Sequence, residues 1–237
     1  MPNLITKHYR RDYTGEIVTY VEDDAMRSVK SEPRDLPRDF GMRSAIVVGN
    51  GPSKNMPDVQ LLIHSNSRKL AESYKMTYAC NLAFNDTPAD YFVISNTDIL
   101  QTINPAEQHK CFVSYDMWVT HRQINLVPYY SYLDAGTTAA YLAAFDGAKN
   151  VFLMGFDGTD GVSVDNVYAG QTGYAVPSST ECFRKFHMFL HDLVKLYNNT
   201  NFYRVRTMHT SNLSVDLSHL PNFKEVSVRE AVLLGDF

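Results

Sequence analysis

The stretch AIVVGNGPSKN, residues 45–55, indicates the fold class more clearly than any other part of the chain. Its first four residues are small or branched and apolar, as in a parallel strand that is buried on both faces. Gly49 and Gly51 follow at once and let the backbone turn tightly and approach a ligand. Pro52 suits the first turn of a helix, where Ser53 offers a hydroxyl and an amide. The segment therefore predicts a strand-to-helix turn whose main-chain amides bind an anion such as a phosphate.

The sequence of this turn differs from two familiar phosphate-binding motifs. It lacks the third glycine of G-x-G-x-x-G, and the chain contains no G-x-x-x-x-G-K-[ST]. A turn with a purely structural role is the alternative interpretation.

Strand and helix signals alternate along the chain from residue 41 onward. We expect strands at 44–48, 76–80, 91–95, 111–114, 150–154 and 202–206. We expect helices at 136–145, after a capping box at 178–181, and near 228–234. The apolar residues of the capped helix recur at helical spacing, which predicts a core-facing side. This order predicts an α/β, Rossmann-like fold, with a mainly parallel sheet and helices on both faces.

Residues 1–40 differ from the rest of the chain because they are rich in charge and contain one strand-like stretch, 16–21. We expect an N-terminal arm that packs on the main domain, residues 41–237, or on a second subunit. A partly disordered tail is the alternative.

Composition excludes several classes of protein. Hydrophobic residues make up 44% of the 237, enough for a sizeable core, and the formal net charge of −4 argues against a nucleic-acid binder. No apolar run is long enough to span a bilayer, and charges come too early for a secretory signal. Three unclustered cysteines indicate reduced thiols, so we expect a cytoplasmic protein. The aromatic content leaves self-association as a homo-oligomer open.

Three asparagines follow expected strands: Asn50, Asn81 and Asn96. In an open α/β sheet, ligands bind beyond the carboxyl ends of the strands, where a carboxamide can both donate and accept hydrogen bonds. We therefore expect all three at one binding edge. The alternative is that each only tolerates a left-handed turn.

A second candidate clamp opens the alanine-rich helix in YLDAGTTAAYLAAFDGAKNVFLMGFDG, residues 132–158. Gly136 and Thr137 lie at the start of this helix, so its amides can approach a ligand. Asp157 follows the next strand and is expected at the same edge, as a ligand for a hydroxyl or as a turn residue. We expect the amides of both clamps to converge on a single crevice.

The order of these segments resembles the bacterial sialyltransferases of the Campylobacter type, and also the related Rossmann-like proteins grouped with archaeal 6-hydroxymethylpterin diphosphokinases. The resemblance covers roughly residues 44–158, with GNGPS and the 133–157 block carrying most of it. It implies a pocket for a CMP-sialic acid donor. By this resemblance the donor's phosphate, ribose, sugar and base would contact Asn50, Gly51, Ser53, Asn81, Asn96, Gly136 and Thr137.

The chain also departs from that family. Asp134-Ala135-Gly136 stands where the family has Thr-Ser-Gly, Tyr132 replaces an arginine, and Thr159 replaces a tyrosine. The family's general-base histidine precedes the long capped helix, and residues 174–177 contain no histidine.

Transfer of a sugar requires a stabilised leaving phosphate and a base. Tyr168 and Tyr174 lie in a glycine-rich stretch, 168–174, that resembles a mobile lid, and we assign Tyr174 to the leaving group. Simple packing of this loop is the alternative. For the base we select Asp157, with Asp160 as a second candidate.

These observations favour a glycosyltransferase that moves a sugar from a nucleotide-linked donor to a glycan or small-molecule acceptor. A diphosphokinase-like transfer to a small heterocycle, which would use magnesium, is one alternative. A non-catalytic binding protein that retains the scaffold is another. No metal site is expected, because the two carboxylates of Asp157 and Asp160 lack a third ligand.

Overall fold

We describe a computed structural model of the chain. It describes residues 5–10, 17–22, 44–66, 75–121, 123–128, 134–158, 166–174, 179–235 and 237. Of the residues considered above, Tyr132, Thr159, Asp160 and the 175–178 part of the loop lie outside this set.

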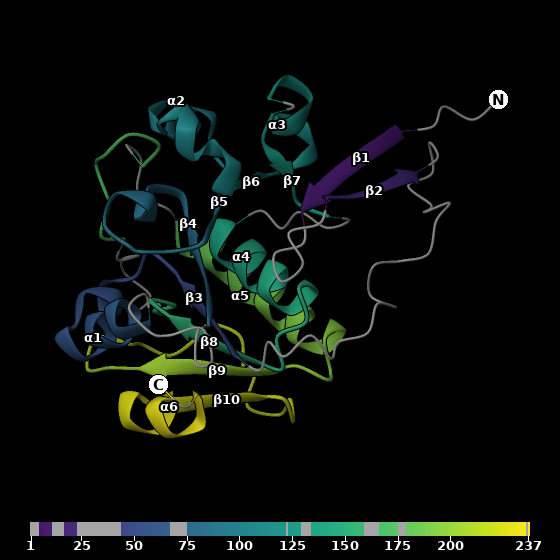
Figure 1. The fold of residues 1–237 in the computed structure, drawn as a ribbon. Coiled ribbons are helices and arrows are strands. Elements are labelled where there is room, and N and C mark those ends of the chain that lie inside the picture. Colours follow the sequence, from purple (N-terminus) through teal and green to yellow (C-terminus); the bar gives the residue numbers. More distant parts are fainter. Residues whose placement is uncertain are drawn as a thin grey trace.

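Eight parallel strands form the central sheet, in the order β10-β9-β8-β3-β4-β5-β6-β7 (Figure 1). The strands are β3 (Ser44–Val48), β4 (Met76–Cys80), β5 (Tyr91–Ile94), β6 (Cys111–Val113), β7 (Asn125–Leu126), β8 (Asn150–Met154), β9 (Asn201–Arg206) and β10 (Phe223–Ser227). The expected α/β class and parallel sheet are confirmed.

The helices of the described chain connect these strands. They are α1 (Pro57–Asn66), α2 (Thr97–Thr102), α3 (Tyr115–Thr120), α4 (Ala135–Phe145), α5 (Thr180–Leu196) and α6 (Val228–Gly235), with 3₁₀ turns at Pro52–Asn55, Asn81–Asn85 and Pro105–Lys110. None of these helices is long and apolar enough to cross a membrane.

The chain changes direction across the sheet at β3. From β3 it adds β4 to β7 on one side, and then returns to place β8 on the other side of β3. The connections on the two sides of such a switch point leave a crevice at the carboxyl ends of the central strands. The carboxyl ends of β3, β4 and β8 therefore mark the place where the fold leaves room for a ligand.

Helices cover both faces of the sheet, as predicted. Alternate β3 residues point to opposite sides, so that Ala45 and Val47 join one core cluster while Ile46 and Val48 join the other. The first cluster contains α4 and α5, which lie side by side (Figure 1). The second contains α1, α2, α3 and α6.

Local signals explain where the two helices next to the crevice begin and end. Asp134 caps α4 by accepting a hydrogen bond from the Thr137 amide, and Gly147, at φ +97°, follows its end. For α5 the predicted capping box is one residue out of register. Ser179 is the cap and accepts a hydrogen bond from the Cys182 amide, because the helix starts at Thr180.

The N-terminal part contains an antiparallel pair, β1 (Ile5–Arg10) and β2 (Ile17–Glu22), of which the sequence predicted only β2. β1 lies beside β7 at the edge of the large sheet (Figure 1). The division of the chain at residue 40 stays a prediction.

Candidate functional site

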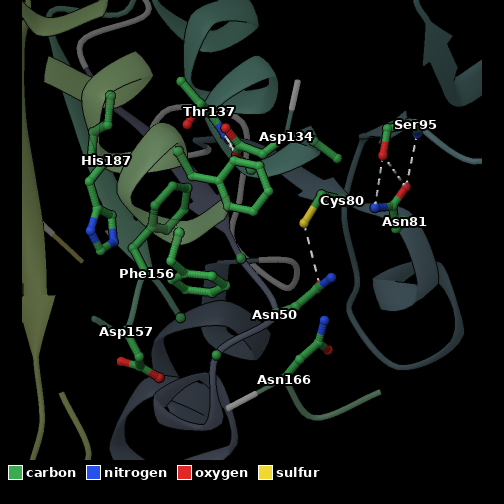
Figure 2. Close-up of a pocket in the computed structure, with 18 of the residues that line it drawn as sticks. Asn50, Cys80, Asn81, Ser95, Asp134, Thr137, Phe156, Asp157, Asn166 and His187 are labelled. Carbon is green, nitrogen blue, oxygen red and sulfur yellow. Dashed lines mark hydrogen bonds between the residues drawn. The ribbon is translucent and has the colours of Figure 1, made fainter. Parts of the chain in front are cut away.

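A cavity of about 200 Å³ lies at the switch point, against the carboxyl ends of β3, β4 and β8. Seven of the nine predicted site residues line it: Asn50, Gly51, Asn81, Gly136, Thr137, Asp157 and Tyr174. The two candidate clamps therefore converge on one cavity, as expected. The other lining residues are Gly49, Cys80, Ser95, Asp134, Ala135, Gly155, Phe156, Asn166, Phe183, Phe186, His187, Leu190 and Leu213. Figure 2 shows this pocket, with polar groups from β3 and β4 facing aromatic rings.

Two predicted site residues do not line the cavity. Ser53 is buried, at 1% exposure, and its amide donates to Asp157 Oδ2 at 2.7 Å. Asn96 caps α2 by accepting a hydrogen bond from the Asp98 amide at 2.8 Å. The Asn-Thr-Asp sequence at 96–98 is a typical cap signal that could have revealed this role.

The predicted anion site in the glycine turn needs a correction, because two of its amides, those of Gly51 and Ser53, already have partners. Gly51 N–H donates to the Gly155 carbonyl at 2.9 Å, and Ser53 N–H donates to Asp157. The turn is followed by a four-residue 3₁₀ turn, where the sequence had predicted the first turn of a helix. These amides join β3 to the end of β8, and Asp157 occupies the position that we had predicted for a phosphate.

Asp157 is held from two sides. Its Oδ2 accepts the Ser53 amide, and its Oδ1 accepts the Thr210 hydroxyl at 3.1 Å. Gly51 must be a glycine here, since a Cβ at this position would lie 2.4 Å from Asp157 Oδ2. A carboxylate has about four acceptor positions, so two remain for a ligand or a proton. The assignment of Asp157 as the base stays a prediction.

The start of α4 shows the same arrangement. Asp134 Oδ1 accepts the Thr137 amide at 2.6 Å, so a carboxylate of the chain occupies the second predicted anion clamp as well (Figure 2). Burial raises the pKa of Asp134 to about 6, although hydrogen bonds from the helix start act in the opposite direction. An aspartate directly before the alanine-rich helical run is a cap signal that could have revealed this role.

Tyr174 is the polar centre of the cavity. Its hydroxyl oxygen accepts hydrogen bonds from Asn50 Nδ2 at 2.6 Å and from Asn81 Nδ2 at 2.7 Å. Burial raises the pKa of Tyr174, so the hydroxyl keeps its proton. The side chain of Asn166 is a third hydrogen-bonding neighbour of this hydroxyl, so the O–H can donate either to Asn166 or to a ligand.

Asn50 and Asn81 are themselves fixed. Asn50 Oδ1 accepts from the Cys80 thiol at 3.3 Å, and Asn81 Oδ1 accepts from the Ser95 amide at 2.9 Å (Figure 2). Asn81 has a left-handed backbone, φ 48°. It is therefore both the turn former of the alternative interpretation and a cavity residue. Burial raises the pKa of Cys80 to about 12, which leaves a neutral thiol.

The segment 166–174, which contains the stretch 168–174 that was predicted to be a lid, is also anchored through Tyr168. Lys54, fully buried, donates to Tyr168 and, at 2.8 Å, to Asp86; Tyr168 also donates to Asp86, at 2.7 Å. Burial alone would raise the pKa of Asp86, but the hydrogen bonds from Lys54 and Tyr168 outweigh this effect and lower it. The ring of Tyr168 stacks on that of Tyr174, so this network helps to place the Tyr174 hydroxyl.

The opposite wall of the cavity comes from α5. Phe183, Phe186, His187 and Leu190 lie at helical spacing on one side of this helix and line the cavity together with Phe156 (Figure 2). The periodicity predicted a core face, and Leu193 and Val194 do lie in the core. The first half of that face contacts the cavity instead.

His187 is a poor base in this setting. Its Nδ1 accepts a hydrogen bond from the Ser214 amide at 3.0 Å, so the neutral ring carries its proton on Nε2. Burial, assisted by the charge of Arg204, lowers the pKa of His187 to about 4. His187 can therefore donate a hydrogen bond at neutral pH.

The charged side chains among the described residues that line the cavity are the carboxylates of Asp134 and Asp157. None of the described residues that line it is a lysine or an arginine. Within the described ranges, no group of three or more His, Cys, Asp or Glu residues is placed to hold a metal ion. An anionic ligand would thus be held by hydroxyl and amide donors, which suits a phosphate with a single charge better than a triphosphate.

Comparison with solved structures finds distant likenesses. The chain is similar to the sialyltransferase CstII from Campylobacter jejuni in complex with a substrate analogue, cytidine-5′-monophosphate, at 16% identity and a TM-score of 0.47, over 77% of this chain and 85% of that chain. It is also similar to an α-2,3-sialyltransferase from Campylobacter jejuni in apo form, at 17% identity and a TM-score of 0.40, over 76% of this chain and 79% of that chain. No family model matches the sequence, and no curated protein matches it either.

Proposed function

We propose that this protein is a glycosyltransferase of the sialyltransferase type, which binds a CMP-linked sugar in the cavity and transfers the sugar to an acceptor. The observation that carries the proposal is the convergence of Asn50 and Asn81 on the hydroxyl of Tyr174 at the switch point. In this proposal, the protonated Tyr174 hydroxyl donates a hydrogen bond to the phosphate of the donor.

In the proposed reaction an acceptor hydroxyl attacks the anomeric carbon of the sugar. The bond between that carbon and the phosphate oxygen breaks, and its electron pair leaves with CMP. Tyr174 donates a hydrogen bond to the phosphate as charge develops there, which lowers the barrier. Asp157 is proposed to take the acceptor's proton through one of its remaining acceptor positions.

The aromatic wall supports the same proposal. Phe156, Phe183 and Phe186 offer flat apolar surface beside the polar groups, and a nucleoside has both a flat ring and polar substituents. The described lining residues include two carboxylates and no lysine or arginine, which favours a phosphodiester over the more highly charged ATP, so the diphosphokinase alternative has no specific support from the described residues.

A non-catalytic binding role is the second candidate. It is favoured by the two hydrogen bonds that already engage Asp157, and by the lowered pKa of His187. The two candidates differ in turnover, since both predict that CMP binds.

The test is the release of CMP from CMP-sialic acid by the purified protein, with and without simple sugars as acceptors. Release above the buffer rate supports the transferase. Binding of CMP without release supports the binding protein. If the protein binds ATP with magnesium and does not bind CMP, both candidates are overturned in favour of diphosphoryl transfer.

A further inference from the structure

Asp134 uses one carboxylate oxygen, and within the described part of the chain its other oxygen accepts no hydrogen bond. Its Oδ1 accepts the Thr137 amide and caps α4. Its Oδ2 is buried and has no hydrogen-bond partner among the described residues, although Asp134 lines the cavity. Capping of α4 therefore explains the position of only one of the two carboxylate oxygens.

Capping by itself does not require an aspartate. Ser, Thr or Asn would supply the one oxygen that an N-cap needs. Leaving a second oxygen buried and unpaired costs free energy, about 1–3 kcal/mol for a typical polar group. The burial that raises the pKa of Asp134 to about 6 reflects the same cost. Almost none of the Oδ2 surface is exposed in the structure, so a ligand that donates a hydrogen bond to it, after a small rotation of the carboxyl group, would recover this cost.

The surroundings of Asp134 suit a flat ligand. A Cβ at Gly136 would lie 3.2 Å from Asp134 Oδ1 and 3.5 Å from the Phe156 ring, so the missing side chain keeps the carboxylate next to an aromatic surface. Across the cavity, the Cys80 thiol donates to Asn50 and is neutral. No described cation of the cavity wall neutralises the carboxylate.

We propose that Asp134 determines the specificity of the cavity by accepting, at Oδ2, a hydrogen bond from a donor group of a bound nucleoside, either the amino group of the base or a hydroxyl of the sugar. The inference rests on the proposed nucleotide site and adds an orientation to it. Because like charges repel, the phosphate lies away from Asp134 and toward Tyr174.

The experiment measures, by calorimetry, the affinities of four nucleotides for the wild type and for two variants. CMP and UMP differ by an amino group against a carbonyl oxygen, and the 2′,3′-dideoxy forms of both lack the sugar hydroxyls. Asp134→Ser keeps the cap and removes the second oxygen. Asp134→Asn replaces that oxygen by an amide donor. Asn104→Ser, at the cap of the exposed Pro105–Lys110 turn, is the control and should leave every affinity unchanged.

If the partner is the base amino group, wild type binds CMP about tenfold or more tightly than UMP, and both Asp134 variants lose this preference. If the partner is a sugar hydroxyl, the variants instead lose the preference for CMP and UMP over their dideoxy forms. Either result supports the proposal.

Two results would overturn it. If the variants lower the affinities for all four nucleotides by the same factor, or change none of these affinities, Asp134 acts only as a helix cap. If the wild type binds none of the four, the proposed nucleotide site fails, and this inference fails with it.

Discussion

The side-chain amide of Asn50 donates a hydrogen bond of 2.6 Å to the hydroxyl of Tyr174, a residue 124 positions later in the chain. This contact joins the turn after β3 to the 166–174 segment at the carboxyl edge of the parallel sheet. Asn81, at the end of β4, donates to the same oxygen at 2.7 Å. Three segments far apart in the sequence are thus fixed around one hydroxyl, and the properties of this cluster can be tested directly.

Tyr174→Phe removes the hydroxyl and leaves the ring in place. We expect the rate of CMP release from CMP-sialic acid to fall about a hundredfold, because one preorganised donor to the leaving phosphate is lost. Two amides also lose their acceptor, so the melting temperature should fall by several degrees. Tyr203→Phe, on β9 and stacked on Phe152, is the matched control. An unchanged rate in Tyr174→Phe would remove this residue from the mechanism.

Lys54→Met tests how the 166–174 segment is held. The substitution removes the ammonium from Asp86 and Tyr168, and we expect a loss of about 1–3 kcal/mol in the free energy of unfolding. Hydrogen exchange of the 166–174 amides should become faster. Lys110→Met, which removes an exposed ion pair with Glu107, should cost less than about 0.5 kcal/mol. Unchanged exchange in Lys54→Met would show that the network does not hold this segment.

Asp134 should make stability depend on pH in an unusual direction. Because its pKa is raised from 3.8 to about 6, the folded protein retains this proton between those values while the unfolded chain releases it. The contribution of Asp134 to stability therefore falls as pH rises from about 4 to about 6, by roughly 2–3 kcal/mol. Asp134→Asn lacks this titration.

The measurement is the free energy of unfolding of wild type and Asp134→Asn at pH 4 and pH 7. Relative to Asp134→Asn, the free energy of unfolding of the wild type should be higher at pH 4 than at pH 7. A constant difference would mean that the carboxylate is not buried in solution. Since the ionised form is the better acceptor, the affinity for CMP should also rise with pH through about 6.

Gly51→Ala tests the contact between β3 and the end of β8. Its Cβ would lie 2.4 Å from Asp157 Oδ2 and 2.7 Å from the Gly155 carbonyl oxygen. We expect a loss of about 2 kcal/mol or more in urea unfolding, together with weaker CMP binding. Thr210→Val creates no overlap but removes the hydrogen bond to Asp157 and the one that Thr210 accepts from the Thr207 amide at 3.0 Å, and should cost about 1 kcal/mol. If both substitutions lower the free energy of unfolding by the same small amount, the turn is not as closely packed as the structure indicates.

Much of the sheet could be predicted from the sequence, because buried parallel strands such as Ser44–Val48 and Asn150–Met154 are short apolar runs that end in glycine. The helices α1, α2 and α3 were not predicted. In α1 the apolar positions Val59, Leu62 and Ile63 and the proline at its start are weak but readable signals. The two-residue β7 has no pattern of its own and is defined only by pairing with β6.

The site could be predicted in location but not in detail. The carboxyl edge, Asn50 and Asn81 follow from strand ends, which are local features. The use of the Ser53 amide depends on Asp157, 104 positions away, and no local pattern reveals such a contact. Likewise, periodicity showed that Phe183 and Phe186 share a face of α5, but whether this face contacts core or cavity depends on how the helix packs in the tertiary structure.

The central claim is that a cytidine nucleotide binds in the cavity at the switch point. Calorimetric titration of CMP into the wild type and into Tyr174→Phe tests it most directly. We predict a single site in the wild type, with binding weakened about tenfold in the variant by loss of one hydrogen bond to the phosphate. If CMP gives no heat at several temperatures, or binds both proteins equally, the cavity is not the nucleotide site.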